Sequence, residues 1–174
     1  TQSPLGKNSH PDCIDAVTET ARLCENLRHD VVEDTPSIDG NLLWESFTKI
    51  MAVGTAAGIS GWAKRLGKKP TPKEFEPFIW SLAEKGREIT APEYLIIIQD
   101  IQRISREIAR FFLNYDLWLT PTLGHPPVLL GTFDFSSTED PFELRRRVAD
   151  FAPFTYLSNA TGQPAMSVPL FWNK

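Results

Sequence analysis

Ser46 and Lys49 are the residues whose types and spacing come closest to a known catalytic pattern. They match the S-x-x-K arrangement of penicillin-recognising enzymes, in which a lysine helps to activate a serine nucleophile. That chemistry also requires S-D-N and K-T-G elements, and neither occurs in the sequence. Residues three positions apart also share one face of any α-helix. We therefore interpret the pair as a chance match on an amphipathic helix.

A second serine, Ser60, lies in a stretch similar to the nucleophile elbow G-x-S-x-G. Trp62 occupies the position of the last glycine, and no predicted strand precedes the serine. The elbow needs a strand before the serine and a helix after it. We therefore assign no catalytic role to Ser60.

No metal site and no cofactor site are predicted. The histidines are His10, His29 and His125, and none has a metal-ligand spacing to another histidine, a cysteine or a carboxylate. The sequence also lacks a glycine-rich phosphate loop. Residues 159–161 match a glycosylation sequon, which is a common pattern. Taken by itself, the chain contains no convincing catalytic constellation.

Composition and charge favour a single globular domain and argue against two classes of partner. The 174 residues are 41% hydrophobic and 23% charged, which is typical of globular proteins. The net charge is −4, and acidic residues flank the tight cluster Arg145–Arg147, so we predict no nucleic-acid binding. No apolar run approaches the roughly 20 residues that span a bilayer, so we predict no membrane partner.

The two cysteines, Cys13 and Cys24, lie on one predicted helix, eleven positions apart. This spacing places them roughly 16 Å from each other along the helix axis. A disulfide needs Cα atoms within about 7 Å, so the two cannot pair with each other. We therefore predict reduced, buried thiols and a cytoplasmic location.

Hydrophobic periodicity predicts helices over residues 11–28, 41–66, 75–85, 90–112, 140–149 and 153–159. Ser9 and Asn41 are predicted to cap the first two helices, and Gly86 to end the third. Thr90 and Glu93 form a capping box at the start of the best-defined helix. The apolar stripe of that helix consists of Tyr94, Ile97, Ile98, Ile101, Ile104, Ile108, Phe111 and Phe112.

Three short segments, 30–33, 117–120 and 165–168, are predicted to be strands. The segment 117–120 is apolar and lies between a helix end and a proline, as in a strand that leads to a functional edge, or in a plain core strand. A helix followed by a strand favours an α/β layer architecture. We therefore predict an α/β fold in which the helix over 90–112 packs along a sheet.

Three segments, taken in order, resemble the amidase signature family. Residues 10–13 with 27–31 are similar to "HPxC…LGHxV", and residues 118–122 with Pro126-Pro127 are similar to "LTPT…PP". Residues 159–170 are similar to "NxTGxPAxSVPL", which is the most specific of the three. The likeness is greatest to bacterial amidases, including those acting on nylon oligomers. In this order the segments resemble the C-terminal half of an amidase.

The resemblance implies a mixed sheet with flanking helices and a parent enzyme that hydrolyses amides through a Ser–cis-Ser–Lys triad. In the family that triad lies in a glycine- and serine-rich N-terminal region, and nothing in this chain is similar to it. No catalytic residue can therefore be assigned here. Asn159 and Gln163 are the residues expected near the substrate, although both could instead satisfy backbone groups of a turn. Arg28 replaces a family glycine, so the first helix is expected to end without a left-handed cap.

Two interpretations of function remain open from the sequence. In the first, residues 1–174 are one domain or fragment of an amidohydrolase, inactive alone, whose partners are the missing N-terminal half and a small-molecule amide substrate. In the second, the chain is a non-catalytic binding or scaffold domain, complete in itself. Neither interpretation fixes the oligomeric state, and a homo-oligomer is compatible with both.

Overall fold

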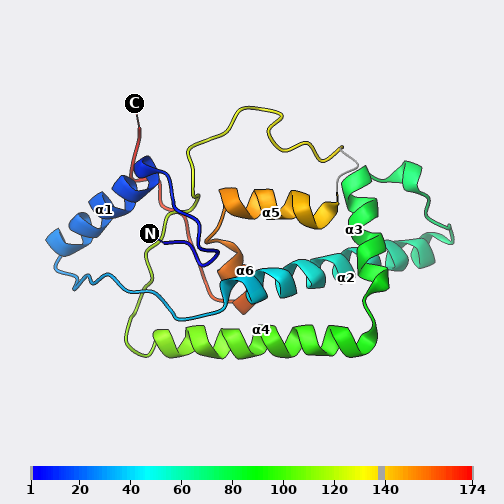
Figure 1. The fold of residues 1–174 in the computed structure, drawn as a ribbon, viewed down its shortest axis with the longest axis horizontal. Helices are drawn as coiled ribbons and strands as arrows, with labels where there is room; N and C mark the ends of the chain where they lie inside the picture. Colours follow the sequence, from blue (N-terminus) through cyan, green and yellow to red (C-terminus); the bar gives the residue numbers. More distant parts are fainter. Residues whose placement is uncertain (1, 137–139, 174) are drawn as a thin grey trace.

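The regular structure of the chain is helical in the computed structural model, which describes residues 2–136 and 140–173 (Figure 1). The helices run in the order α1 (Pro11–Asn26), α2 (Gly40–Leu66), the 3-10 helix η1 (Pro72–Glu74), α3 (Pro77–Glu88), α4 (Ala91–Phe111), α5 (Pro141–Phe151) and α6 (Tyr156–Thr161).

The hydrophobic core lies between α2, α4 and α6. α2 packs against α3, α4 and α6, and α6 also packs against α4. Leu43 of α2 and Ile104 and Ile108 of α4 are completely buried there. The predicted apolar stripe of α4 is confirmed at its centre, where Ile97, Ile101, Ile104 and Ile108 face the core. The stripe packs against helices and not against a sheet.

Helices α3 and α2 approach each other closely at Gly86. A Cβ atom added to Gly86 would lie 2.1 Å from the carbonyl oxygen of Ala52, so only glycine fits there. The prediction that α3 ends at Gly86 is wrong, since the helix continues to Glu88. By contrast, Gly54 and Gly58 of α2 have nothing within 4 Å of such a Cβ, and α2 is unbroken.

The helix caps show how far local signals hold. The capping box of Thr90 and Glu93 is confirmed. At α1 the N-cap is His10 and not Ser9, and at α2 it is Asp39 and not Asn41. Asp39 accepts a hydrogen bond of 2.9 Å from the Leu42 amide, because its carboxylate reaches the free N–H groups of the first turn.

The prediction of an α/β fold with a mixed sheet is wrong for the described residues, which contain no strand. The segments 30–33, 117–120 and 165–168 have no regular secondary structure, and no backbone hydrogen bond joins them to a neighbour. An extended apolar segment becomes a strand only when another segment supplies the ladder. Trp118 instead packs against the helical core, while Leu117 is 82% exposed.

Arg28 provides the left-handed residue that ends α1. Its φ angle is 71°, and the His29 amide donates to the Cys24 carbonyl at 3.1 Å while the Arg28 amide donates to Glu25 at 2.9 Å. These two bonds form a Schellman motif. The expectation that α1 would end without a left-handed cap is therefore wrong. An arginine occupies the strained conformation that glycine adopts without cost.

Candidate functional site

Parts of the three segments that carry the family resemblance meet at one end of the molecule, which we call the motif end (residues 10–13, 120–127 and 164–173). The backbone N–H of His10 donates to the carbonyl of Gly124 at 2.8 Å. The hydroxyls of Thr122 and Ser167 lie 3.0 Å apart and form one hydrogen bond. Segments separated by more than 100 residues are thus joined by direct contacts.

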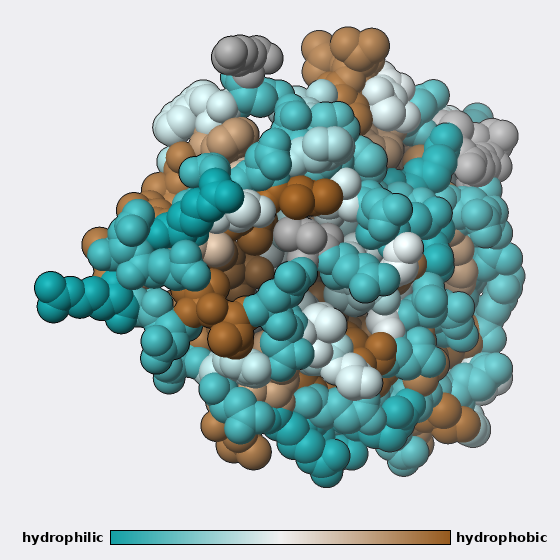
Figure 2. All heavy atoms as spheres, turned by 60° about the vertical axis from the view of Figure 1, so that its left-hand side comes forward, coloured by the Kyte–Doolittle hydropathy of each residue, from teal (hydrophilic) through white to brown (hydrophobic). Residues whose placement is uncertain are grey.

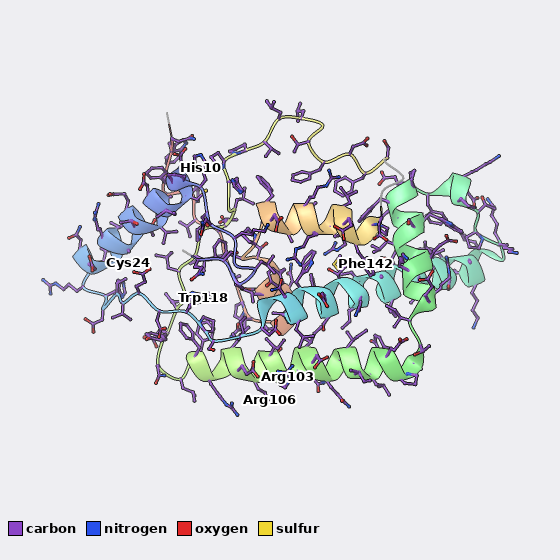
Figure 3. The ribbon with its side chains drawn as sticks, viewed as in Figure 1. His10, Cys24, Arg103, Arg106, Trp118 and Phe142 are labelled. Atoms are coloured by element: carbon purple, nitrogen blue, oxygen red, sulfur yellow. The ribbon has the colours of Figure 1, made fainter. Side chains whose placement is uncertain are left out.

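Two further contacts join segments of the motif end around the start of α1. The Asn173 amide donates to the Asp12 carboxylate at 2.9 Å, which ties the C-terminal segment to the first helical turn. The rings of His10 and His125 lie with their centroids 6.4 Å apart. Figures 1 and 3 show the start of α1, with His10 labelled, beside the C-terminal segment.

Gly124 is the centre of this arrangement. Besides accepting from His10, it donates its own N–H to the carbonyl of Phe151 at 2.8 Å. A Cβ atom at this position would lie 3.1 Å from the ring of Pro153. The loop therefore joins the start of α1 to the end of α5, and the small residue permits the close approach.

The described part of the motif end contains no activated nucleophile. Nδ1 of His10 accepts from the Asp12 amide at 3.2 Å and serves as the cap of α1. Burial, and then the neighbouring Asp12 carboxylate, raise the pKa of the Cys13 thiol. A thiol with a raised pKa stays protonated near neutral pH and is a poor nucleophile. The arrangement can bind and position, but it holds no nucleophile–base pair.

Asn159 and Gln163, the predicted substrate contacts, lie on either side of the end of α6. Asn159 is exposed on the helix, and Gln163 is half-buried just after Gly162, whose φ of 76° ends the helix. Oε1 of Gln163 lies 3.4 Å from the Thr161 hydroxyl, which itself donates to the carbonyl of Leu157 at 2.8 Å. A role in substrate binding therefore stays a prediction for both residues.

The serines singled out from the sequence sit in helical surroundings. Ser46 is 3% exposed on the inner face of α2, and no hydrogen bond joins it to Lys49 in the described structure. The Ser60 hydroxyl donates to the Ala56 carbonyl at 2.8 Å. Lys49 instead lines a shallow depression of about 280 Å³ and, after the hydrogen bonds from Thr90, contributes to lowering the pKa of Glu93.

The depression beside Lys49 and a second one of about 320 Å³ do not include Asn159 or Gln163. The lining of the depression beside Lys49 is charged, and Lys85 lies within 4 Å of both Glu88 and Asp140 there.

No group of three or more metal-ligating side chains occurs in residues 2–136 and 140–173. No helix among these residues is long and apolar enough to cross a membrane. Cys13 and Cys24 are both free thiols, but they are half-buried and not buried as predicted.

Comparison with known proteins decides the family. The family model described as Amidase matches residues 2–174. The chain belongs to the amidase family. The predicted resemblance to the amidase signature is thereby confirmed.

Curated amidase relatives match almost the whole chain at low identity. A lipoamidase of Enterococcus faecalis is 26% identical over 192 residues, covering 100% of this chain and 26% of the relative. A 6-aminohexanoate-cyclic-dimer hydrolase of Paenarthrobacter ureafaciens is 23% identical over 180 residues, which cover 98% of this chain and 36% of the relative. The chain therefore spans about a quarter to a third of the length of these relatives.

A solved structure shares the fold of this amidase segment. The structure of 6-aminohexanoate cyclic dimer hydrolase aligns with a TM-score of 0.82 and 19% identity. The alignment covers 93% of this chain and 35% of the other. The helical arrangement in Figure 1 is thus also found within a larger hydrolase.

Sequence reasoning missed the residues that hold the motif end together. Gly124, Thr122 and Ser167 lie within or beside the segments that matched the family, but nothing in their spacing showed that they would meet. The small size of Gly124, two residues before a Pro-Pro pair, was the one local signal of a close approach.

Proposed function

We propose that this amidase chain is one part of an amidohydrolase that cleaves linear carbon–nitrogen bonds, and that the groups that break the bond lie outside these residues. The match of the family model over residues 2–174 carries the proposal. The lack of a nucleophile–base pair among the described residues agrees with it. The named relatives, a lipoamidase and a cyclic-dimer hydrolase, point to a small-molecule amide as substrate.

The chemistry proposed for the whole enzyme is that of a Ser–cis-Ser–Lys triad. The outer serine attacks the amide carbonyl, while the bridging serine and a neutral lysine transfer its proton to the leaving amine. Backbone N–H groups hold the developing oxyanion. In this proposal the present chain supplies the wall of the site, with Asn159 and Gln163 facing the substrate.

The remainder of the amidase is the partner that we propose for the motif end. Exposed apolar side chains gather in its extended segments and beside them, where Leu129 is 86%, Met166 86% and Trp172 79% exposed. Figure 2 shows hydrophobic side chains reaching the surface on this face. Exposed apolar surface of this kind marks a site of association. The two free thiols agree with a cytoplasmic setting for the assembled enzyme.

Assaying the chain alone tests the proposal. We expect no hydrolysis of short linear amides and no covalent labelling by a fluorophosphonate, because the residues that the structure describes include no activated serine. The matched variants are Ser46→Ala, at the S-x-x-K pattern, and Ser167→Ala, at the motif end. Turnover or labelling that either substitution abolishes would contradict the proposal.

The roles of Asn159 and Gln163 need the complete amidase that contains this chain. We expect Asn159→Ala and Gln163→Ala each to raise KM several-fold, since each removes a polar contact to the substrate. Gln102→Ala, on the exposed side of α4, is the control. Unchanged KM values in both variants would leave the two side chains with a structural role in the turn.

The alternative, a complete binding or scaffold domain, is favoured by one observation. The core between α2, α4 and α6 is one contiguous cluster of buried residues. Mass spectrometry of the protein from its natural source distinguishes the two. A native chain of about 19.6 kDa would support the binding domain, and a much larger one would support the amidohydrolase.

A further inference from the structure

One end of the molecule carries a net positive charge, whereas the net charge of the rest of the chain is negative. Residues 62–76 contain five cations and two carboxylates, whereas the rest of the sequence contains thirteen cations and twenty carboxylates. We call residues 62–73 the basic tip; its cations are Lys64, Arg65, Lys68, Lys69 and Lys73. Figure 1 places the basic tip where α2 ends and η1 begins, at the opposite end of the molecule from α1.

Two large apolar side chains stand among these cations. Trp62 is 59% and Leu66 is 69% exposed, and their spacing of four residues places them on one face of α2. Ile59, one turn earlier, is buried against Ala83 of α3. The packing of α2 against α3 thus ends before the basic tip and leaves both side chains in solvent.

The basic tip has a defined shape. Gly67 ends α2 in the left-handed conformation with φ of 63°. The Thr71 amide donates to Glu74 at 2.9 Å in a capping box, and Lys68 also pairs with Glu74. Among residues 2–136 and 140–173, Lys68 is the one cation of the tip with a carboxylate partner. Lys64 and Arg65 lie in the last turn of α2, and they are exposed, as are Lys69 and Lys73 beyond it.

We propose that the basic tip binds the surface of a membrane rich in anionic lipids, with Trp62 and Leu66 inserted at the level of the headgroups. Clustered lysines attract an anionic leaflet, and tryptophan is enriched at the membrane–water boundary. This proposal departs from the prediction of no membrane partner, which was based on the lack of a spanning segment. Peripheral binding needs no spanning helix, so the absence of one in the described residues does not bear on it. The proposal is independent of the amidohydrolase assignment.

A nucleic acid fits the basic tip less well than a lipid surface. The Arg65 guanidinium lies 5.1 Å from the centre of the Trp62 ring and covers a face on which a base would stack. Leu66 offers no hydrogen bond and no aromatic face. In a lipid interface, however, the side chains of Trp62 and Leu66 would both lose solvent contact, and Arg65 could turn toward a phosphate.

Vesicle co-sedimentation of the 174-residue chain tests this inference. We expect binding to vesicles of phosphatidylcholine with phosphatidylserine, little binding to phosphatidylcholine alone, and weaker binding as salt rises. Lys64→Gln together with Lys69→Gln should weaken binding about 30-fold, since each cation contributes about fivefold. Trp62→Ala should weaken it about tenfold, because it removes the inserted ring.

A matched control lies on the exposed side of α4, where Leu95 is 60% exposed and Arg106 is exposed. Leu95→Ala with Arg106→Gln should leave vesicle binding unchanged. Equal loss in this control, or no binding to anionic vesicles at low salt, would overturn the proposal. Binding that depends on Lys64 and Lys69 but not on Trp62 would also overturn it, and polyglutamate binding would then assign the tip to an acidic protein partner. Amide hydrolysis is not a readout here, so either proposal can fail without the other.

Discussion

The body of the molecule, by which we mean helices α2, α3, α4 and α6, and the motif end are held together by different interactions. α2 buries eight residues, including Leu43 and Trp44, whereas none of the sixteen residues of α1 is buried. Side-chain and backbone hydrogen bonds such as Thr122–Ser167 and His10–Gly124 hold the motif end. The contacts that join the family motifs to one another therefore lie at the less densely packed end, although Trp118 and Ala160 of these motifs pack against the core.

This difference has a consequence for local stability. Segments with few buried apolar contacts open at a lower free energy than segments in a core. We expect amide hydrogens of α1 to exchange faster than those of α4, whose Ile104 and Ile108 are completely buried.

Gly86→Ala should destabilise the body by about 3 kcal/mol, because the new methyl group would meet the Ala52 backbone, which cannot move alone. The control is Gly58→Ala, on the open face of α2, which should stabilise by about 1 kcal/mol through helix propensity. Urea unfolding of both variants measures the two values. Equal effects would show that the α2–α3 crossing is looser than described.

Arg28→Gly should stabilise the end of α1 by about 1 kcal/mol, because glycine adopts the left-handed conformation without strain. Hydrogen exchange should be slower in α1 and unchanged in α4, since α4 belongs to the buried core and α1 contains no buried residue. Arg22→Gly, inside α1, is the control and should have the opposite sign. A uniform change across both helices would mean that α1 and the body unfold together.

Thr122→Val should weaken the motif end by about 0.5 kcal/mol, since it removes the hydroxyl bonded to Ser167 at an exposed position. The effect should appear as faster exchange in residues 164–173. Thr18→Val is the control, because its hydroxyl bonds only to the Ile14 carbonyl within α1. An effect confined to the core helices would contradict the assignment of this bond to the motif end.

The smallest effect is expected from the contact between Tyr115 and Asp34, whose hydroxyl and carboxylate oxygens lie 2.6 Å apart. The bond from Tyr115, and then the Thr35 amide, lower the pKa of Asp34. Because the folded pKa lies below the unfolded one, the contact stabilises above about pH 4 and is lost as the pH falls through the folded pKa. The same bond raises the pKa of Tyr115, so the contact is also lost at strongly alkaline pH.

An NMR titration of Asp34 checks this contact. In Tyr115→Phe the pKa of Asp34 should move back toward its ordinary value, whereas Tyr94→Phe should leave it unchanged. The stability difference between wild type and Tyr115→Phe should be present at pH 7 and absent at pH 2. A pKa of Asp34 that does not respond to Tyr115→Phe would refute the bond.

The sequence by itself determined the helices and the family. Predicted helices over 41–66 and 90–112 are observed as Gly40–Leu66 and Ala91–Phe111, because capping and apolar periodicity are local properties. The capping box at Thr90 is correct for the same reason. The order of the motif segments sufficed to predict the amidase family, which the family model confirms.

Only the tertiary structure decided the rest. The segment 117–120 reads as a strand locally, but a strand exists only when a distant segment pairs with it, and no described segment does. Gly86 reads as a helix end, but its contact with Ala52 is made across two helices. The meeting of Thr122 with Ser167 joins residues 45 positions apart, a distance over which composition and periodicity carry no information.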